Sequence, residues 1–193
     1  MISDSAVDLM NSLMLDDDQN INVYLYKNQR NFQIRKYGYI AKFLDSSWYI
    51  GDNRGTKVLL TSPANPGNFH DYESVMGAVL HEVVHAYVSI INPDIALWLT
   101  EGMALYLSNG EPFTRDMLES WMVPSFDDTR SNNPIRLADN NGYTYAHTYI
   151  EYLDYTYSWD KVIDLVESED YTEVLGKDMQ GVYSDWINYL ESH

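Results

Sequence analysis

The sequence predicts an α+β fold in which a small β-rich part precedes a longer helical part. Before residue 70, short runs alternate apolar with polar side chains, as half-buried strands do. After residue 70, apolar side chains recur with helical spacing. A chain of 193 residues, 45% of them hydrophobic, is long enough to bury a substantial core. We therefore expect one domain over residues 1–193, with 1–70 as a mainly β lobe and 71–193 as a helical part.

The β-rich part consists of short segments separated by turn residues. Residues 4–15 form an amphipathic pattern typical of a helix. Strands are expected at 21–26, 37–44, 48–50 and 57–61, with turns at Gly51-Asp52-Asn53 and Gly55. These segments predict a small antiparallel or mixed sheet.

Helices follow a loop at residues 62–68, which is rich in proline and asparagine. The first helix is expected over residues 72–91, and Pro93 separates it from the next. Residues 124–142, rich in Asp, Asn and Pro, are interpreted as a long loop, and residues 167–170 as a charged surface run. The remaining helices are expected at 95–108, 114–122, 144–157, 159–168 and 178–191.

Charge and cysteine content exclude several classes of function. The formal net charge of −17 disfavours nucleic acids and anionic membranes as partners. Its carboxylates either keep the surface soluble or attract basic peptides or divalent cations, and the charge alone does not choose between the two. The chain has no cysteine, which rules out disulfides, thiolate metal sites and cysteine nucleophiles. The first residues carry neither the basic region nor the apolar region of a secretory signal, and no run approaches about 20 uninterrupted apolar residues. We expect a cytoplasmic protein without a membrane span, with a secreted form trimmed of its leader as the alternative; its oligomeric state stays open.

One histidine motif lies inside the helix expected at residues 72–91. His81 and His85 are four residues apart, so on a helix both imidazoles can reach one ion. Glu101, sixteen residues after His85, can supply a third ligand. Two imidazoles and a carboxylate are zinc ligands that leave a fourth position for water, whose pKa falls to about 7 on the metal. Glu82 is placed to take the proton of that water, so the pattern predicts a zinc-dependent hydrolase, most often a peptidase.

The same spacing also arises by chance. His81 and His85 could be hydrogen-bonded helix histidines, and Glu101 an exposed helix carboxylate. The metal site is favoured because a buried Glu82 between two histidines would be costly without a partner, and because apolar residues flank Glu101.

The second helix carries a longer motif, Trp98-Leu99-Thr100-Glu101-Gly102-Met103-Ala104-Leu105-Tyr106. Together with the histidine motif, it resembles the gluzincin metallopeptidases, specifically the peptidase MA-like family. Segments 143–153, 173–177 and 184–190 are similar to later parts of that family, so the resemblance covers about residues 70–191. It implies a zincin-like fold, with the sheet lobe over the active-site helix.

The resemblance also implies roles for single residues. His81, His85 and Glu101 would bind one Zn²⁺ per chain, and Glu82 would be the general base. A peptide or protein substrate would pair with an edge strand, for which the region 37–61 holds the candidates.

Two positions depart from the thermolysin-like relatives. Leu105 stands where they carry an aspartate that orients a ligating histidine, and Thr100 replaces an asparagine. The orienting group must therefore come from elsewhere, such as Asp94 or a backbone carbonyl.

A further donor is expected to stabilise the negative charge that develops on the substrate carbonyl oxygen. Tyr143 is the first choice, because it matches the tyrosine that opens the corresponding helix of the family, and Tyr145 and His147 are the alternatives. Each could instead be a packing residue. Two other functions stay open: a zinc-dependent hydrolase with a non-peptide substrate, and a catalytically degenerate zinc-binding interaction protein, against which the intact Glu82 argues.

Overall fold

The computed structural model describes residues 2–15, 19–38, 50–108 and 114–192. The fold is α+β, as the sequence predicts. Internal contacts divide the chain into two compact units, Met1–Ile90 and Ile91–His193, and each is described by itself. The division falls at the end of a long helix, so the two histidines of this helix belong to the first unit.

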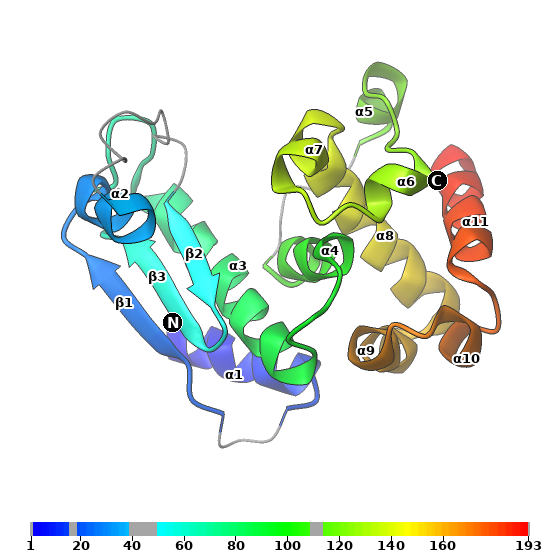
Figure 1. The fold of residues 1–193 in the computed structure, drawn as a ribbon, viewed down its shortest axis with the longest axis horizontal. Coiled ribbons are helices and arrows are strands. Elements are labelled where there is room, and N and C mark those ends of the chain that lie inside the picture. The colour runs from blue at the N-terminus through cyan, green and yellow to red at the C-terminus, as the bar shows by residue number, and fades with distance from the viewer. Residues whose placement is uncertain (1, 16–18, 39–49, 109–113, 193) are drawn as a thin grey trace. The chain divides into compact units, whose positions relative to one another are not determined.

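The first unit contains a three-stranded mixed sheet in the order β1-β3-β2 (Figure 1). Strand β1 (Asn22–Tyr26) is parallel to β3 (Lys57–Thr61), and β2 (Gly51–Arg54) is antiparallel to β3. The central strand β3 is buried from Val58 to Thr61, which explains its continuous apolar run.

Three helices accompany this sheet: α1 (Ile2–Ser12), α2 (Gln29–Tyr37) and α3 (Tyr72–Ile91). Helix α3 has the bounds that the apolar periodicity predicts. Helix α2 is not predicted; Asn28 caps it by accepting a hydrogen bond from the backbone N–H of Asn31 at 2.9 Å. Its Phe32 is fully buried, and α2 packs against β1 and β3.

Two expectations for this unit are wrong. Gly51-Asp52-Asn53, expected as a turn, lies in β2. Tyr37, expected to start a strand, is the last residue of α2, because the cap and the burial of Phe32 favour a helix there. Residues 39–44, and 48 and 49 of the strand expected at 48–50, lie outside the described residues.

Among the described helices, α3 alone is long and apolar enough to cross a membrane by length and composition. In its most apolar window, 44% of the residues are buried inside the structure. A core helix passes the same test, so this finding is weak evidence for a membrane span.

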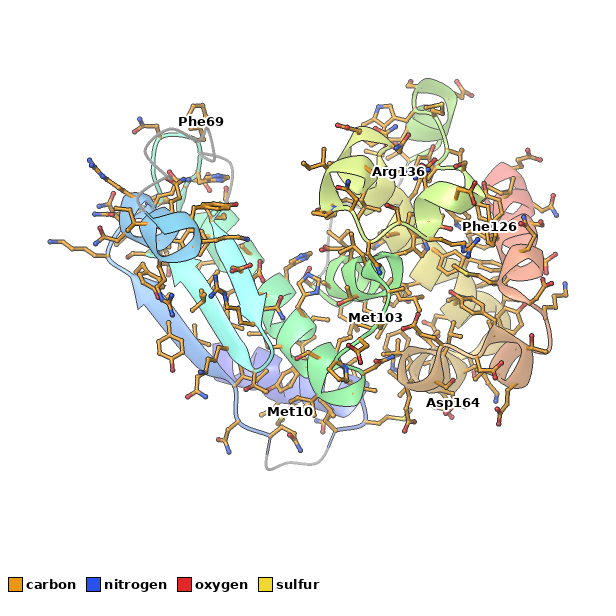
Figure 2. All side chains as sticks on the ribbon, in the orientation of Figure 1. Met10, Phe69, Met103, Phe126, Arg136 and Asp164 are labelled. Carbon is orange, nitrogen blue, oxygen red and sulfur yellow. The ribbon has the colours of Figure 1, made fainter. Side chains whose placement is uncertain are left out.

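The second unit is helical, and its longest helix is α8 (Gly142–Tyr157) (Figure 1). Helix α8 packs against α4 (Leu97–Leu107), α7 (Pro134–Asp139), α9 (Trp159–Ser168) and α11 (Met179–Ser192). The core of this unit is aromatic: Trp98, Tyr145 and Trp186 are almost completely buried, and the rings of Trp98 and Tyr145 lie 5.7 Å and 6.1 Å from the ring of Trp186. Met103, labelled in Figure 2, is buried in the same unit. The other described helices of this unit are α5 (Arg115–Ser120), α6 (Phe126–Thr129) and α10 (Tyr171–Leu175).

The prediction of a long loop at residues 124–142 is also wrong, because this segment contains helices α6 and α7. Ser125 and Asp128 form a capping box at the start of α6. Asn133 caps α7, whose first residue is Pro134. The Asp, Asn and Pro residues that favour a loop are thus the caps of two short helices.

Candidate metal centre

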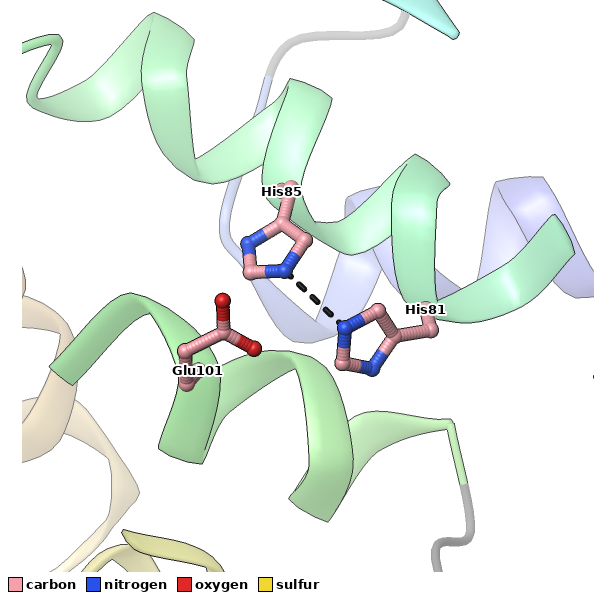
Figure 3. Close-up of side chains that lie close together, drawn as sticks. All are labelled: His81, His85 and Glu101. Atoms are coloured by element: carbon pink, nitrogen blue, oxygen red, sulfur yellow. Dashed lines mark hydrogen bonds between the residues drawn. The ribbon is translucent and has the colours of Figure 1, made fainter. Parts of the chain in front are cut away.

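Helix α3 brings the two histidines of the motif together. The Nε2 atoms of His81 and His85 are 3.0 Å apart, and the two rings meet edge to face (Figure 3). His85 is buried, whereas His81 is half-buried. In a tetrahedral zinc site with bonds of about 2.05 Å, two nitrogen ligands stand about 3.3 Å apart. The spacing of the two imidazoles is therefore close to the spacing that one ion requires.

Glu101 supplies the third donor from helix α4, where it is half-buried. One ligand atom from each of His81, His85 and Glu101 lies within 4.8 Å of the others, so this group could hold a metal ion (Figure 3). Two neutral nitrogens and one anionic oxygen suit Zn²⁺, so the chemistry of the donor set fits the predicted metal.

Close packing of α4 against α8 determines where Glu101 lies within the second unit. At the next residue, Gly102, a Cβ atom would lie 2.5 Å from the backbone oxygen of Ala146 and 2.8 Å from Cγ1 of Ile150. Only glycine allows this approach. The glycine of the Glu-Gly pair therefore lets α4 lie directly against the backbone of α8.

Glu82, the predicted general base, lies against strand β2 of the first unit. A Cβ atom at Gly51 would lie 2.7 Å from Oε1 of Glu82. Gly51 is buried, and its missing side chain is what leaves room for the carboxylate. Glu82 thus lies beside strand β2. Within the part of the chain that the structure describes, β2 pairs with β3 alone.

The three candidate donors on α8 differ in their surroundings. Tyr145 is fully buried, and its hydroxyl donates a hydrogen bond to the backbone oxygen of Trp121 at 3.1 Å. Tyr143 and His147 are half-buried and, being four residues apart, lie on one face of the helix. Burial lowers the pKa of His147, so its imidazole is neutral near pH 7.

The ring of His147 lies 5.6 Å from the ring of Tyr106 on α4, measured between centroids. The hydroxyl of Tyr106 donates to Oδ2 of Asp154 at 2.8 Å, and burial raises the pKa of this phenol. Asp94, suggested as an orienting group, is exposed in the turn before α4. Its backbone N–H donates to Oδ1 of Asn92 at 3.1 Å.

Two contacts at the start of α4 are not predicted by the sequence. Oε1 of Glu169 accepts a hydrogen bond from the backbone N–H of Ala96 at 3.1 Å, and Oδ1 of Asn132 accepts one from Leu97, also at 3.1 Å. Glu169 belongs to the run at 167–170 that the sequence predicts to be surface, but it is half-buried. Its partner Ala96 lies 73 residues away in the chain, so no local pattern reveals the contact.

Comparisons with protein-family models, with curated proteins and with solved structures found no match. The chemistry of this centre is therefore inferred from the motif and from the geometry of the chain's own residues.

Proposed function

We propose that this protein is a zinc-dependent metallopeptidase of the zincin-like type. The observation that supports it best is the convergence of His81, His85 and Glu101, whose ligand atoms lie within 4.8 Å of one another. Zn²⁺ held by these residues would polarise the peptide carbonyl and lower the pKa of a bound water. The chain's own residues perform the remaining tasks.

Glu82 is the general base of this proposal. It follows His81 on α3, and its half-buried carboxylate lies against the backbone of β2. From this place Glu82 takes the proton of the attacking water and then delivers it to the leaving amine. An amide in the same place could accept a hydrogen bond but could not take the proton.

The substrate lies along β2 in this proposal. An extended peptide can add itself to the free side of an edge strand by backbone hydrogen bonds. Strand β2 lies in the region 37–61, where the substrate strand is expected, and its Gly51 contacts the side chain of Glu82. A peptide bound there would present a carbonyl beside the general base.

Tyr143 donates to the carbonyl oxygen as negative charge develops on it, and the neutral His147 is the alternative donor. Tyr145 is excluded from this role in our proposal, because Trp121 already accepts the hydrogen bond from its hydroxyl. Tyr143 and His147 share a face of α8, the helix that contacts α4 beside Glu101.

The proposal is tested by a peptide-library cleavage profile of the wild-type protein beside Glu82→Gln. Glu82→Gln should keep the metal and lose hydrolysis, because the amide cannot take a proton. Glu73→Gln, at an exposed position of the same helix, is the matched control and should cleave as the wild type does.

Three outcomes are informative. Undiminished cleavage by Glu82→Gln would remove this residue from its assigned role. A zinc-loaded wild type that cleaves no peptide would contradict the peptidase and favour a non-peptide substrate or a binding function. Parallel loss of activity in Glu73→Gln would show that the charge of α3, rather than the base, is responsible.

A further inference from the structure

The turn that leads into α4 is held by the end of α9. The side-chain amide of Asn92 donates to the backbone oxygen of Val166 at 3.0 Å and to Oε1 of Glu169 at 3.3 Å. The same Oε1 accepts the backbone N–H of Ala96, the N-cap residue of α4, at 3.1 Å. One carboxylate oxygen thus joins the C-terminal end of one helix to the start of another.

Glu169 adopts an unusual backbone conformation to make these contacts. Its φ angle of +51° lies in the left-handed region, where glycine is the usual residue at a helix end. Its own N–H closes α9 by donating to the backbone oxygen of Leu165 at 2.8 Å. A glycine here would relieve the strain but would carry no carboxylate, which indicates that the side chain of Glu169 has a use.

The start of a helix is a favourable place for a carboxylate. The first N–H groups of α4 have no partner within the helix, and the positive end of its dipole attracts a negative charge. Ala96, at the N-cap, has no side-chain acceptor of its own, and the structure gives it no side-chain cap. Glu169 supplies the missing acceptor from a distant part of the chain.

We infer that Glu169 is a positioning residue of the metal centre. Glu101 is five residues beyond Ala96, within the first two turns of α4. Glu169 holds the N-cap residue at the start of this helix, next to the contact between Asn132 and Leu97, and the contact of Gly102 with Ala146 fixes its middle. Glu101 lies between these two fixed points, so loss of the first lets the turn that carries the ligand fray. This inference rests on the proposed function, in which Glu101 binds the metal.

The test measures the zinc affinity of folded protein by competition with a chromophoric chelator. Glu169→Ala removes the acceptor and should weaken zinc binding about tenfold, the lower end of the loss seen when a supporting partner of a ligand is removed. Glu169→Gln keeps an oxygen acceptor and should restore most of the affinity. Glu167→Ala removes an exposed glutamate of α9 with the same change in charge, and should bind zinc as the wild type does.

A second control separates positioning from general destabilisation. Ser125→Ala deletes the capping box of α6, a helix of the same unit that carries no ligand. It should lower the unfolding temperature and leave the zinc affinity unchanged.

Each outcome supports or overturns the inference. Unchanged affinity in folded Glu169→Ala, or an equal loss in Ser125→Ala, would overturn it and leave the metallopeptidase proposal intact. Absence of zinc binding by the wild type would instead overturn the proposed function. If Glu169→Ala does not fold, the zinc affinity of Glu169→Gln is compared with that of the wild type instead. About tenfold weaker zinc binding by Glu169→Gln would contradict the inference, because the amide still offers an oxygen that accepts hydrogen bonds.

Discussion

Replacement of Gly102 by alanine tests the packing that places Glu101. The added methyl group would lie 2.5 Å from the backbone oxygen of Ala146 and 2.8 Å from Cγ1 of Ile150. The side chain of Ile150 can move, but the backbone oxygen of Ala146 belongs to α8 and cannot rotate away. Helices α4 and α8 would therefore have to separate by several tenths of an ångström.

The net effect is the difference between two opposing terms. Overpacking of this kind costs about 1–3 kcal/mol. Alanine gains about 1 kcal/mol over glycine inside a helix. Because a backbone atom blocks the methyl group, we expect the upper part of the overpacking range and a net destabilisation of about 1–2 kcal/mol. For a chain of this size, that lowers the unfolding temperature by about 2–8 °C.

Thermal unfolding followed by circular dichroism measures this effect, and Gly77→Ala is the matched control. Gly77 lies in α3, is exposed, and has nothing within 4 Å of the position that a methyl group would occupy, so alanine should stabilise the protein by up to about 1 kcal/mol there. Zinc affinity should fall in Gly102→Ala alone. If both substitutions raise the unfolding temperature equally, the close approach of α4 and α8 at Gly102 is refuted.

Three further predictions concern single side chains. The hydrogen bond from the hydroxyl of Ser125 lowers the pKa of Asp128 in the folded protein. The ionised carboxylate of Asp128 therefore stabilises the fold above the unfolded pKa of about 3.9, and this stabilisation is lost as the pH falls through the lower folded pKa. Urea unfolding of wild type and Asp128→Asn should differ at pH 7, and the difference should shrink as the pH falls below the unfolded pKa of about 3.9; an unchanged difference would contradict this. Burial lowers the pKa of His147, so an NMR titration of its imidazole should give a midpoint below about 6.5. The folded protein should lose stability as the pH falls through that midpoint, because the unfolded chain binds the proton more readily. A midpoint above about 6.5 would contradict the burial. Tyr143→Phe should slow peptide hydrolysis at unchanged metal content; if Tyr145→Phe has that effect instead, the donor is misassigned.

The sequence correctly predicts the elements whose bounds follow from the local pattern of apolar residues. The apolar stripe of α3 is continuous over five turns, so the periodicity alone gives the bounds of the helix and places both histidines on one face. The run in β3 predicts a strand because it is buried on both faces. These two elements carry most of what the sequence correctly predicts in the first unit.

The errors arise where a contact joins distant residues, or where one local composition suits both a loop and a helix start. Gly51 has the composition of a turn, but it is a glycine because the side chain of Glu82 lies against it. The capping carboxylate of Glu169 and its partner Ala96 are far apart in the chain, so their contact exists only in the folded protein. The caps of α6 at Ser125 and of α7 at Asn133 have a composition typical of loops, because the same residues favour turns and helix starts.

Zinc content tests the central claim most directly. Protein purified without chelator and dialysed against zinc should retain about one equivalent per chain by inductively coupled plasma mass spectrometry. His85→Ala should lose this zinc, because it removes a buried ligand, whereas His70→Ala, outside the ligand group, should retain it. Equal zinc content in His85→Ala and the wild type, or no zinc in either, would contradict a metal centre at His81, His85 and Glu101.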